Sequence, residues 1–546
     1  MFKNHLKIAF RNIRKHKGFA FINVTGLAVG IGCCLMILLY IQDELSFDSF
    51  HSKKDRIYRV DKTVLEEGGQ IVHTAEMPGN FAPTLVQDYP EVESAVRLRP
   101  WWDAMLISRS EKRLKIANVI ITDSTFFEIF DFALLRGDPH KALAEPLSVV
   151  ITEEVARQFF GDADPMGQVL EGLYDMPLKI TGIAKAAPTH SHIRFDVLIS
   201  WSTSTNSAYA DRFDWMNRWI TQAVFTYILL APEASPTALE AKFPAFMKTY
   251  MARWADKYFP YLQPLGDIHL RSTGIQFQHN HNAGNILLIY VFAVTAVLIL
   301  AIACINFMNL TTARATRRAK EVGMRKVVGA EKKHLIRQFL SESMLFAMLA
   351  LAIAIVIIEF ALPFFNELTQ RQLGFSLTNN PLLFAGMFFI TLLAGIAAGS
   401  YPAFVLSAFR PVEVFKGSQG STLRGVFSRK ILVIAQFFFA IILIVAAAVV
   451  YRQMDYMQSK DLGFKKDQVI IIPFDGSSLR SQAHSFKNAV LQNLDVLSAA
   501  LTSGGPGLGA TGFDMLPEGW AISERHGVPT IGVDFDFIDT YKLRIA

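Results

Sequence analysis

The stretch ILLIYVFAVTAVLILAIACIN, residues 286–306, decides what kind of fold this chain adopts. It contains no charged side chain, and a helix of about 20 apolar residues spans the hydrocarbon core of a bilayer. Four other stretches are mostly apolar and contain no Lys or Arg: 19–41, 339–362, 382–404 and 431–451. Glu342 and Glu359 lie near the two ends of the second of these. The sequence therefore predicts an α-helical membrane protein with about five transmembrane helices.

The first stretch could also be a secretory signal peptide. Its apolar run continues past Cys34 to Tyr40, which is too long for an ordinary signal core, and no Ala-x-Ala site follows. Gly30 stands where a lipoprotein signal ahead of Cys33 would need Leu. A retained helix over 19–41 is therefore expected.

Basic residues concentrate in three short segments, 1–18, 311–337 and 409–430, which together carry 20 basic and 3 acidic residues. The long segments 43–284 and 453–546 carry net charges of −7 and −3. Because Lys and Arg accumulate on the cytoplasmic side of membrane proteins, the three basic segments are expected inside and the two long ones outside. The overall charge of +6 is thus a topology signal, and nucleic acid is excluded as a partner.

The composition excludes several other classes of protein. Of the 546 residues, 51% are apolar and only 19% are charged, which argues against a disordered chain. The three cysteines (Cys33, Cys34 and Cys304) all fall in expected spans, so no disulfide framework holds the outer segment.

The N-terminal segment 1–18 has apolar residues at helical spacing, with basic residues on the other face. This pattern is typical of an amphipathic helix on the inner leaflet. A solvated, positively charged terminus is the alternative. The apolar positions are Phe2, Leu6, Phe10 and Ile13.

The outer segment 43–284 alternates strand-like and helix-like patterns, which predicts a mixed α+β domain. Residues 147–151 form an apolar, β-rich run, and Thr152 can cap a helix that ends at Gly161. Residues 178–183 and 224–230 are predicted to be strands. Residues 238–258 are predicted to be a helix interrupted near Pro244.

An internal repeat links the two outer segments at an offset of about 411 residues. Tyr40-Ile41-Gln42 follows the first span as Tyr451-Arg452-Gln453 follows the fifth, and KKDRI at 53–57 matches KKDQV at 465–469. The residues Asp123, Phe126, Glu128, Phe130, Phe132 and Leu134 likewise match Asp534, Phe537, Asp539, Tyr541, Leu543 and Ile545. We expect a duplicated chain whose second copy is cut short at Ala546.

Motifs for enzyme chemistry are absent from the sequence. No Walker A pattern, HExxH, CxxC or GxSxG occurs, so no catalytic residue, cofactor or metal site is predicted. His279 and His281 lie in a polar stretch before the second span, and His190 and His192 follow Pro188. A juxtamembrane linker and a loop are favoured over metal binding for these two pairs.

The inner loop between the second and third spans contains AKEVGMRKVVGA, residues 319–330. Apolar residues alternate with charges there, and Gly323 and Gly329 permit turns or close approach. This composition fits a short helix that docks on a partner, and equally a basic stop-transfer loop.

The stretch EVGMRKVVGA resembles the E-[IV]-G-x-[RK]-[RK]-x-x-G-A signature of FtsX/MacB-type ABC transporter permeases. SYPA at 400–403 and RPVEVFKG at 410–417 are similar to the exit of the fourth helix in that family. Residues 121–199, with FFG at 159–161 and DPMG at 164–167, resemble the MacB-type periplasmic core.

The resemblance implies a domain order for the chain. It is a cytoplasmic amphipathic helix (1–18), transmembrane helix 1 (19–41), a periplasmic MacB-like α+β domain (42–285), an FtsX-like permease domain with helices 2–4 (286–408) and the coupling loop 311–337, a cytoplasmic linker (409–430), transmembrane helix 5 (431–451) and an incomplete second periplasmic domain (452–546).

The resemblance also implies a non-catalytic permease subunit that transmits ATP-driven movement from a separate cytoplasmic ATPase to periplasmic domains, for export or extrusion of a periplasmic or membrane substrate. A bacterial inner-membrane location, a dimeric or pseudo-dimeric arrangement and a periplasmic adaptor are further expectations. The residues expected to couple to the ATPase are Glu321, Gly323, Met324, Arg325, Lys326, Gly329 and Ala330. The rival hypothesis is a membrane-anchored periplasmic sensor or interaction protein without an ATPase.

Overall fold

The computed structural model forms two compact units, Met1–Ser46 with Asn285–Gln458, and Phe47–Gly284 with Ser459–Ala546. The residues that it describes are 17–66, 69–108, 112–172, 176–280, 283–313, 322–324, 326–328, 331–369, 371, 373–374, 381–408, 420–464, 468–472, 482–505, 511–515, 518 and 526–543. The predicted amphipathic helix over 1–18 lies almost entirely outside them.

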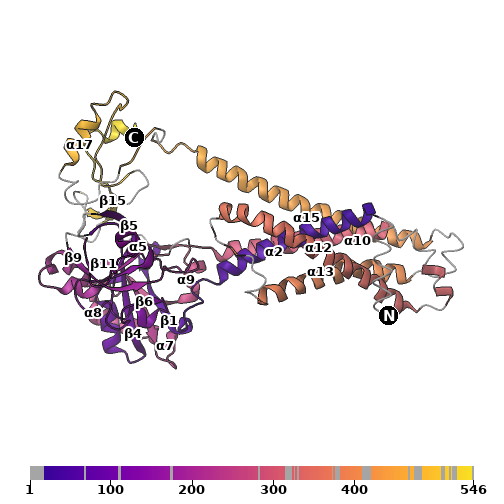
Figure 1. The fold of residues 1–546 in the computed structure, drawn as a ribbon, viewed down its shortest axis with the longest axis horizontal. Helices are drawn as coiled ribbons and strands as arrows, with labels where there is room; N and C mark the ends of the chain where they lie inside the picture. Colours follow the sequence, from indigo (N-terminus) through magenta and orange to yellow (C-terminus); the bar gives the residue numbers. More distant parts are fainter. Residues whose placement is uncertain are drawn as a thin grey trace. The chain divides into compact units, whose positions relative to one another are not determined.

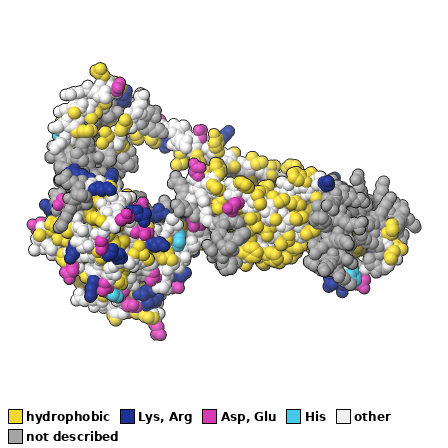
Figure 2. Space-filling view, viewed as in Figure 1, with side chains coloured by type: hydrophobic (Ala, Val, Ile, Leu, Met, Phe, Trp, Pro, Cys, Tyr) yellow, Lys and Arg dark blue, Asp and Glu magenta, His cyan; other side chains and the backbone are white. Residues whose placement is uncertain are grey.

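The first unit is helical. In the described part of the chain, five helices are long and apolar enough to cross a membrane, and each contains one of the predicted spans. Hydrophobic side chains cover the visible face of these helices (Figure 2). The prediction of a helical membrane protein with about five spans is confirmed. The helices are α2 (Lys17–Leu45), α10 (Ile286–Ala313), α12 (Lys332–Thr369), α13 (Pro381–Ala408) and α15 (Gly420–Ser459).

Small residues let these helices approach closely, as is common where helices meet in lipid. Helix α2 packs against α10 and α12, and α12 packs against α13. Gly32 of α2 faces Ala354 of α12, and Gly399 of α13 faces Ser343 of α12. Helix α15 meets α10 through a side-chain hydrogen bond from Asn309 to Gln436, 3.3 Å long.

The second unit is built on one mixed sheet (Figure 1). Its strand order is β13-β2-β1-β11-β4-β5-β10-β7-β9-β6, while β12 pairs with β1, β3 with β11, and β8 with β4 and β9. The strands are β1 (Ile57–Leu65), β2 (Ile71–Thr74), β3 (Met77–Pro78), β4 (Val92–Ser108), β5 (Arg113–Thr122), β6 (Leu134–Arg136), β7 (Ser148–Thr152), β8 (Val169–Gly172), β9 (Met176–Ala184), β10 (Val197–Ser200), β11 (Gln222–Leu230), β12 (Tyr258–Pro264) and β13 (Ile275–Gln276).

Short helices connect and cover these strands, so the outer domain is mixed α and β as predicted. Most strand pairs are antiparallel, whereas β5–β10, β7–β9 and β2–β13 are parallel. The helices are α3 (Phe81–Asp88), α4 (Phe126–Ile129), α5 (Glu153–Phe160), α6 (Ala210–Phe213), α7 (Pro236–Glu240), α8 (Phe243–Tyr250) and α9 (Leu265–Arg271).

Helix α5 begins and ends where local sequence signals place it. Strand β7 leads into Thr152, whose hydroxyl accepts a hydrogen bond from the backbone N–H of Val155. The helix ends at Gly161, whose φ of 60° is readily available to glycine. The strands predicted over 178–183 and 224–230 are found as β9 and β11.

The helix predicted over 238–258 is wrong at its C-terminal end. Pro244 lies in the first turn of α8, where proline needs no N–H partner, and α8 ends at Tyr250. Tyr258 begins β12, which pairs with β1 instead of continuing a helix.

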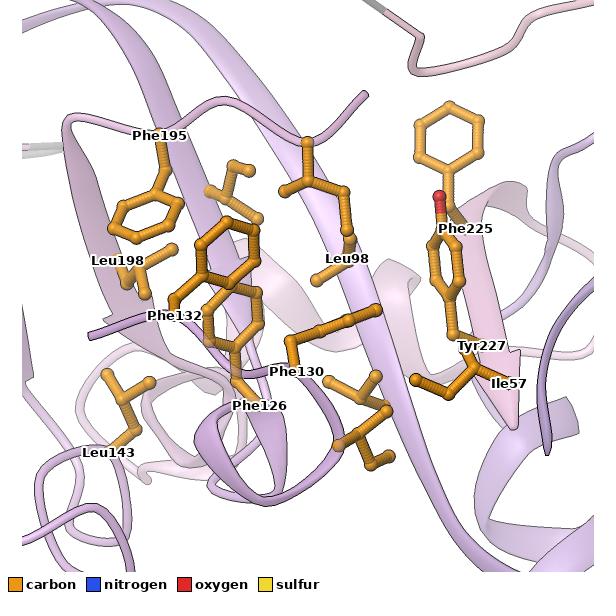
Figure 3. Packing of buried hydrophobic residues seen from close by; sticks show 14 of the residues in the cluster. Ile57, Leu98, Phe126, Phe130, Phe132, Leu143, Phe195, Leu198, Phe225 and Tyr227 are labelled. Atoms are coloured by element: carbon orange, nitrogen blue, oxygen red, sulfur yellow. The ribbon is translucent and has the colours of Figure 1, made fainter. Parts of the chain in front are cut away.

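Aromatic rings fill much of the outer core (Figure 3). Phe126, Phe130, Phe132 and Phe195 are buried, and the rings of Phe126 and Phe132 are stacked with centroids 5.4 Å apart. The domain is thus held by packed apolar side chains, which supply its stability without a disulfide.

The segment after α15 contains α17 (Ala483–Val490), a two-stranded sheet of β14 (Thr511–Met515) and β15 (His526–Thr530), and α18 (Phe537–Tyr541).

Candidate functional site

The loop between α10 and α12, residues 311–337, contains the predicted coupling residues. Its described part includes a short helical segment whose Val322 is buried against Leu335 and Phe339 of α12 and Ala403 of α13. The ammonium group of Lys326 donates a hydrogen bond to the carbonyl oxygen of Ser407, 2.7 Å away. These contacts hold the segment against the ends of two helices.

The Lys326 contact has a clear electrostatic reason. Ser407 lies in the last turn of α13, where carbonyl groups lack partners within the helix and the helix dipole is negative. A lysine ammonium group is a suitable donor there. Lys326 therefore positions the segment, and its ammonium group points at α13.

The opposite side of the segment is apolar and exposed. Met324, Val327 and Val328 are 60%, 67% and 84% exposed, and the backbone N–H of Val328 bonds to the carbonyl of Met324. These three side chains lie outside the five apolar spans, on the same segment that Val322 and Lys326 hold against α12 and α13. The structure thus divides the interleaved apolar residues into one buried anchor and three exposed ones.

Of the predicted coupling residues, Gly323, Met324 and Lys326 lie on this segment, with Gly323 buried. Glu321, Arg325, Gly329 and Ala330 lie outside the described residues.

The outer domain has a second polar feature that the sequence did not indicate. His192, assigned to a loop, is fully buried, and its two ring nitrogens contact Asp48 and Tyr227. Asp48 and His192 are 144 positions apart, so no local pattern marks them as partners.

The stretch after β13 is also more ordered than a solvated linker. His279 is buried, and its ring lies 5.8 Å from that of Phe225. Asn280 donates to the carbonyl of Ile268, 2.9 Å away. His281 lies outside the described residues. Within the described ranges, no group of three His, Cys, Asp or Glu side chains converges.

The sequence is similar to curated proteins named macrolide export ATP-binding/permease protein MacB. The one from Vibrio parahaemolyticus is 21% identical over 424 residues, which cover 76% of this chain and 60% of that protein. The one from Bdellovibrio bacteriovorus is 30% identical over 125 residues, 22% of this chain and 18% of that protein. This chain therefore spans 60% or less of these two relatives.

A solved structure of the periplasmic region of MacB from Actinobacillus actinomycetemcomitans is 12% identical and has a TM-score of 0.28. The match covers 38% of this chain and 89% of that one.

Two domain families match the chain in the order in which its elements occur. Residues 20–246, which include most of α2 and of the mixed sheet, match the MacB-like periplasmic core domain. Residues 293–411, which include α12, α13 and the loop with its exposed apolar segment, match the FtsX-like permease C-terminal domain. The chain therefore contains a MacB-like periplasmic core domain followed by an FtsX-like permease C-terminal domain.

Proposed function

We propose that the chain is the membrane subunit of an ABC transporter and that a separate cytoplasmic ATPase binds its 311–337 loop. The observation that carries this proposal is the exposed apolar surface of Met324, Val327 and Val328 on a segment anchored by Val322 and Lys326. Burial of such side chains against a partner is favourable by about 25 cal/mol per Å². Because Val322 and Lys326 anchor the segment, Met324, Val327 and Val328 would present an apolar surface to a folded protein partner.

The chain itself is proposed to be non-catalytic, since its sequence contains no Walker A motif. ATP binding by the partner would favour one of two arrangements of the permease, and the periplasmic domains would respond to that change. The proposed outcome is export or extrusion of a periplasmic or membrane substrate, with a periplasmic adaptor as a further partner.

The distribution of basic residues supports an orientation with the 311–337 loop in the cytoplasm and the mixed sheet in the periplasm of a bacterial inner membrane. This orientation places the proposed docking surface where a cytoplasmic ATPase can reach it.

A duplicated arrangement is also proposed, in which 452–546 belongs to a second periplasmic domain. Asp123 accepts a hydrogen bond from the backbone N–H of Arg97 (2.8 Å), as Asp534 does from Leu501 (2.8 Å). A short helix follows each aspartate, α4 in one case and α18 in the other. The shared local geometry supports the repeat and hence a pseudo-dimeric permease.

The docking proposal is tested by expressing the full chain together with the ABC-type ATPases encoded in the same genome and purifying the chain from the membranes. Wild-type chain should retain a P-loop ATPase, and Val327→Asp with Val328→Asp should lose it because two charges would have to be buried at the interface. Leu494→Asp is the matched control, since Leu494 is 97% exposed in the other unit.

A third variant distinguishes residues that anchor the segment from residues that contact the ATPase. Lys326→Met removes the hydrogen bond to Ser407 and should weaken ATPase retention without abolishing it, because the three exposed side chains remain. Equal ATPase retention by the wild type and the Val327/Val328 double variant would contradict the docking proposal and favour a sensor without an ATPase.

A further inference from the structure

Asp48 fastens the segment that follows α2 to the interior of the outer domain. It lies three residues beyond Leu45, the last residue of α2, and is 1% exposed. Its backbone N–H donates to the carbonyl of His190 (2.9 Å). Its carboxylate accepts hydrogen bonds from the hydroxyl of Ser191 (3.1 Å), the backbone N–H of His192 (3.1 Å) and Nδ1 of His192 (2.8 Å).

The backbone of Asp48 is held in an unusual conformation. Its φ is 56°, in the left-handed region, which costs a non-glycine residue about 1 kcal/mol or more. The surrounding hydrogen bonds stabilise this conformation. Aspartate adopts this region more readily than most residues, because its carboxylate can bond to nearby groups.

The hydrogen bonds continue from His192 into the sheet. Nε2 of His192 lies 2.8 Å from the hydroxyl of Tyr227 on β11, and Tyr227 stands opposite Arg59 in the β1–β11 pair. Arg59 is bound to both carboxylate oxygens of Asp61, at 2.6 and 3.0 Å, and to Gln263 on β12 at 2.7 Å. We call Asp48, His192, Tyr227, Arg59 and Asp61 the buried relay.

The bonds between the segment after α2 and β11 follow from one tautomer of His192. With Nδ1 of His192 protonated, that nitrogen donates to Asp48 and the Tyr227 hydroxyl donates to Nε2. The relay therefore connects the segment after α2 to β11, which pairs with β1 in the sheet.

Apolar side chains surround the relay. Tyr227 stands among Ile57, Leu98 and Phe130 (Figure 3), with its ring 5.4 Å from that of Phe130. In such surroundings an unpaired polar group is costly, which favours the bonds among Asp48, His192 and Tyr227. Replacing buried ion pairs by apolar side chains of similar volume is often neutral or stabilising in proteins, so stability alone does not account for such a network.

The relay is not a catalytic site, although it combines a carboxylate, an imidazole and a hydroxyl. Asp48, His192 and Tyr227 are at most 1% exposed, so no substrate reaches them.

The segment that leaves the domain is fastened to the same place. The ring of Phe47 is stacked on that of His269 in α9, with centroids 3.4 Å apart, and the carbonyl of His269 accepts a hydrogen bond from Gly284 (2.9 Å). Gly284 ends the outer unit just before α10. The two segments that connect the domain to α2 and α10 therefore meet within it.

We propose that the buried relay makes residues 47–51 one rigid body with the sheet, so that a displacement of α2 moves the whole periplasmic domain instead of bending a hinge. The relay residues are positioning residues. This inference rests on the proposed function only for the source of the movement, which is ATP binding by the partner.

The experiment compares hydrogen exchange in wild type and in Tyr227→Phe, using the full chain in nanodiscs without nucleotide. Tyr227→Phe removes one hydroxyl and retains the ring. Backbone amides of 47–51 and 190–192 should exchange about tenfold faster, while α8 remains unchanged. Tyr250→Phe is the matched control, because its hydroxyl donates to Asp88 (2.7 Å) at the surface.

Unchanged exchange over 47–51 in both Tyr227→Phe and Asp48→Asn would overturn the inference, as would faster exchange spread evenly over the domain. These results are obtained without an ATPase. They are therefore independent of the docking experiment, whose failure would remove the proposed source of movement and leave the rigid connection intact.

Discussion

Gly30 of α2 lies so close to Ala303 of α10 that a Cβ atom on Gly30 would stand 2.4 Å from the Cβ of Ala303. In the sequence, α2 directly precedes residues 47–284 and α10 directly follows them. The absence of a side chain at Gly30 is what permits this approach.

Gly30→Leu should therefore force α2 away from α10. We expect a loss of about 1–3 kcal/mol of stability, seen as a lower thermal midpoint of the full chain in detergent. Gly386→Leu is the control, because a Cβ at Gly386 of α13 meets no atom within 4 Å. Equal midpoints for the two variants would show that the close helix contact does not limit stability.

A buried ion pair joins the C-terminal ends of α2 and α12 in the helical unit. Arg371, just after α12, binds Glu44 near the end of α2, and Glu44 is 2% exposed. Removing one partner of such a pair leaves an uncompensated charge, which costs about 3–5 kcal/mol. Arg371→Met should therefore destabilise the helical unit strongly in thermal unfolding.

The double variant Arg371→Met with Glu44→Gln should recover much of this loss, because no buried charge remains. Arg136→Met is the control, since the Arg136–Asp164 pair is more than half exposed and should contribute little. A double variant no more stable than Arg371→Met would rule out the unpaired charge as the cause.

Local signals in the sequence predicted local structure well, and failed where distant segments meet. The strand, capping threonine and glycine stop around α5 are all within 15 residues of one another, and they were found as predicted. The helix predicted beyond Tyr250 failed because residues 258–264 pair with β1, some 200 positions earlier. That pairing overrides a local helical pattern.

The same distinction between local and distant contacts applies to the 311–337 loop and to the buried relay. The interleaved apolar residues of the 311–337 loop predicted docking from composition, but only packing against Leu335 and Phe339 shows that Val322 is the anchor. The contact between Asp48 and His192 depends on tertiary structure alone, since nothing near either residue indicates its partner.

His51 should make the outer domain sensitive to acid. Burial, outweighing the attraction of Asp48 and Asp131, lowers the pKa of His51 from 6.5 to about 4. The geometry agrees, because Nδ1 of His51 accepts a hydrogen bond from the backbone N–H of Asp131 (3.0 Å) and protonation would remove that acceptor. His192 is the other titratable side chain that faces it.

The direction of this pH effect follows from the number of protons that the folded and unfolded chains bind. Between pH 6.5 and 4 the unfolded chain binds a proton at His51 that the folded domain does not, so stability falls as the pH decreases across this window. The loss is about 3 kcal/mol if His51 acts alone. His51→Asn keeps an acceptor for Asp131 without titrating, and its stability should depend less on pH in that range.

Denaturant unfolding followed by tryptophan fluorescence measures this effect, because six of the seven tryptophans lie between residues 101 and 254. His140→Asn is the control, since His140 is exposed. If His51→Asn and the wild type lose stability in parallel from pH 6.5 to 4, the acid sensitivity comes from another group.

The proposed orientation predicts opposite labelling of two exposed positions. Val328 is 84% exposed on the 311–337 loop, and Leu494 is 97% exposed in the segment after α15. In a variant with Cys33, Cys34 and Cys304 replaced by Ala, a membrane-impermeant maleimide applied to spheroplasts should label Leu494→Cys and not Val328→Cys. Permeabilised membranes should label both. Labelling of Val328→Cys in intact spheroplasts would place the loop outside, where a cytoplasmic ATPase could not bind it, and the docking proposal would fail with it.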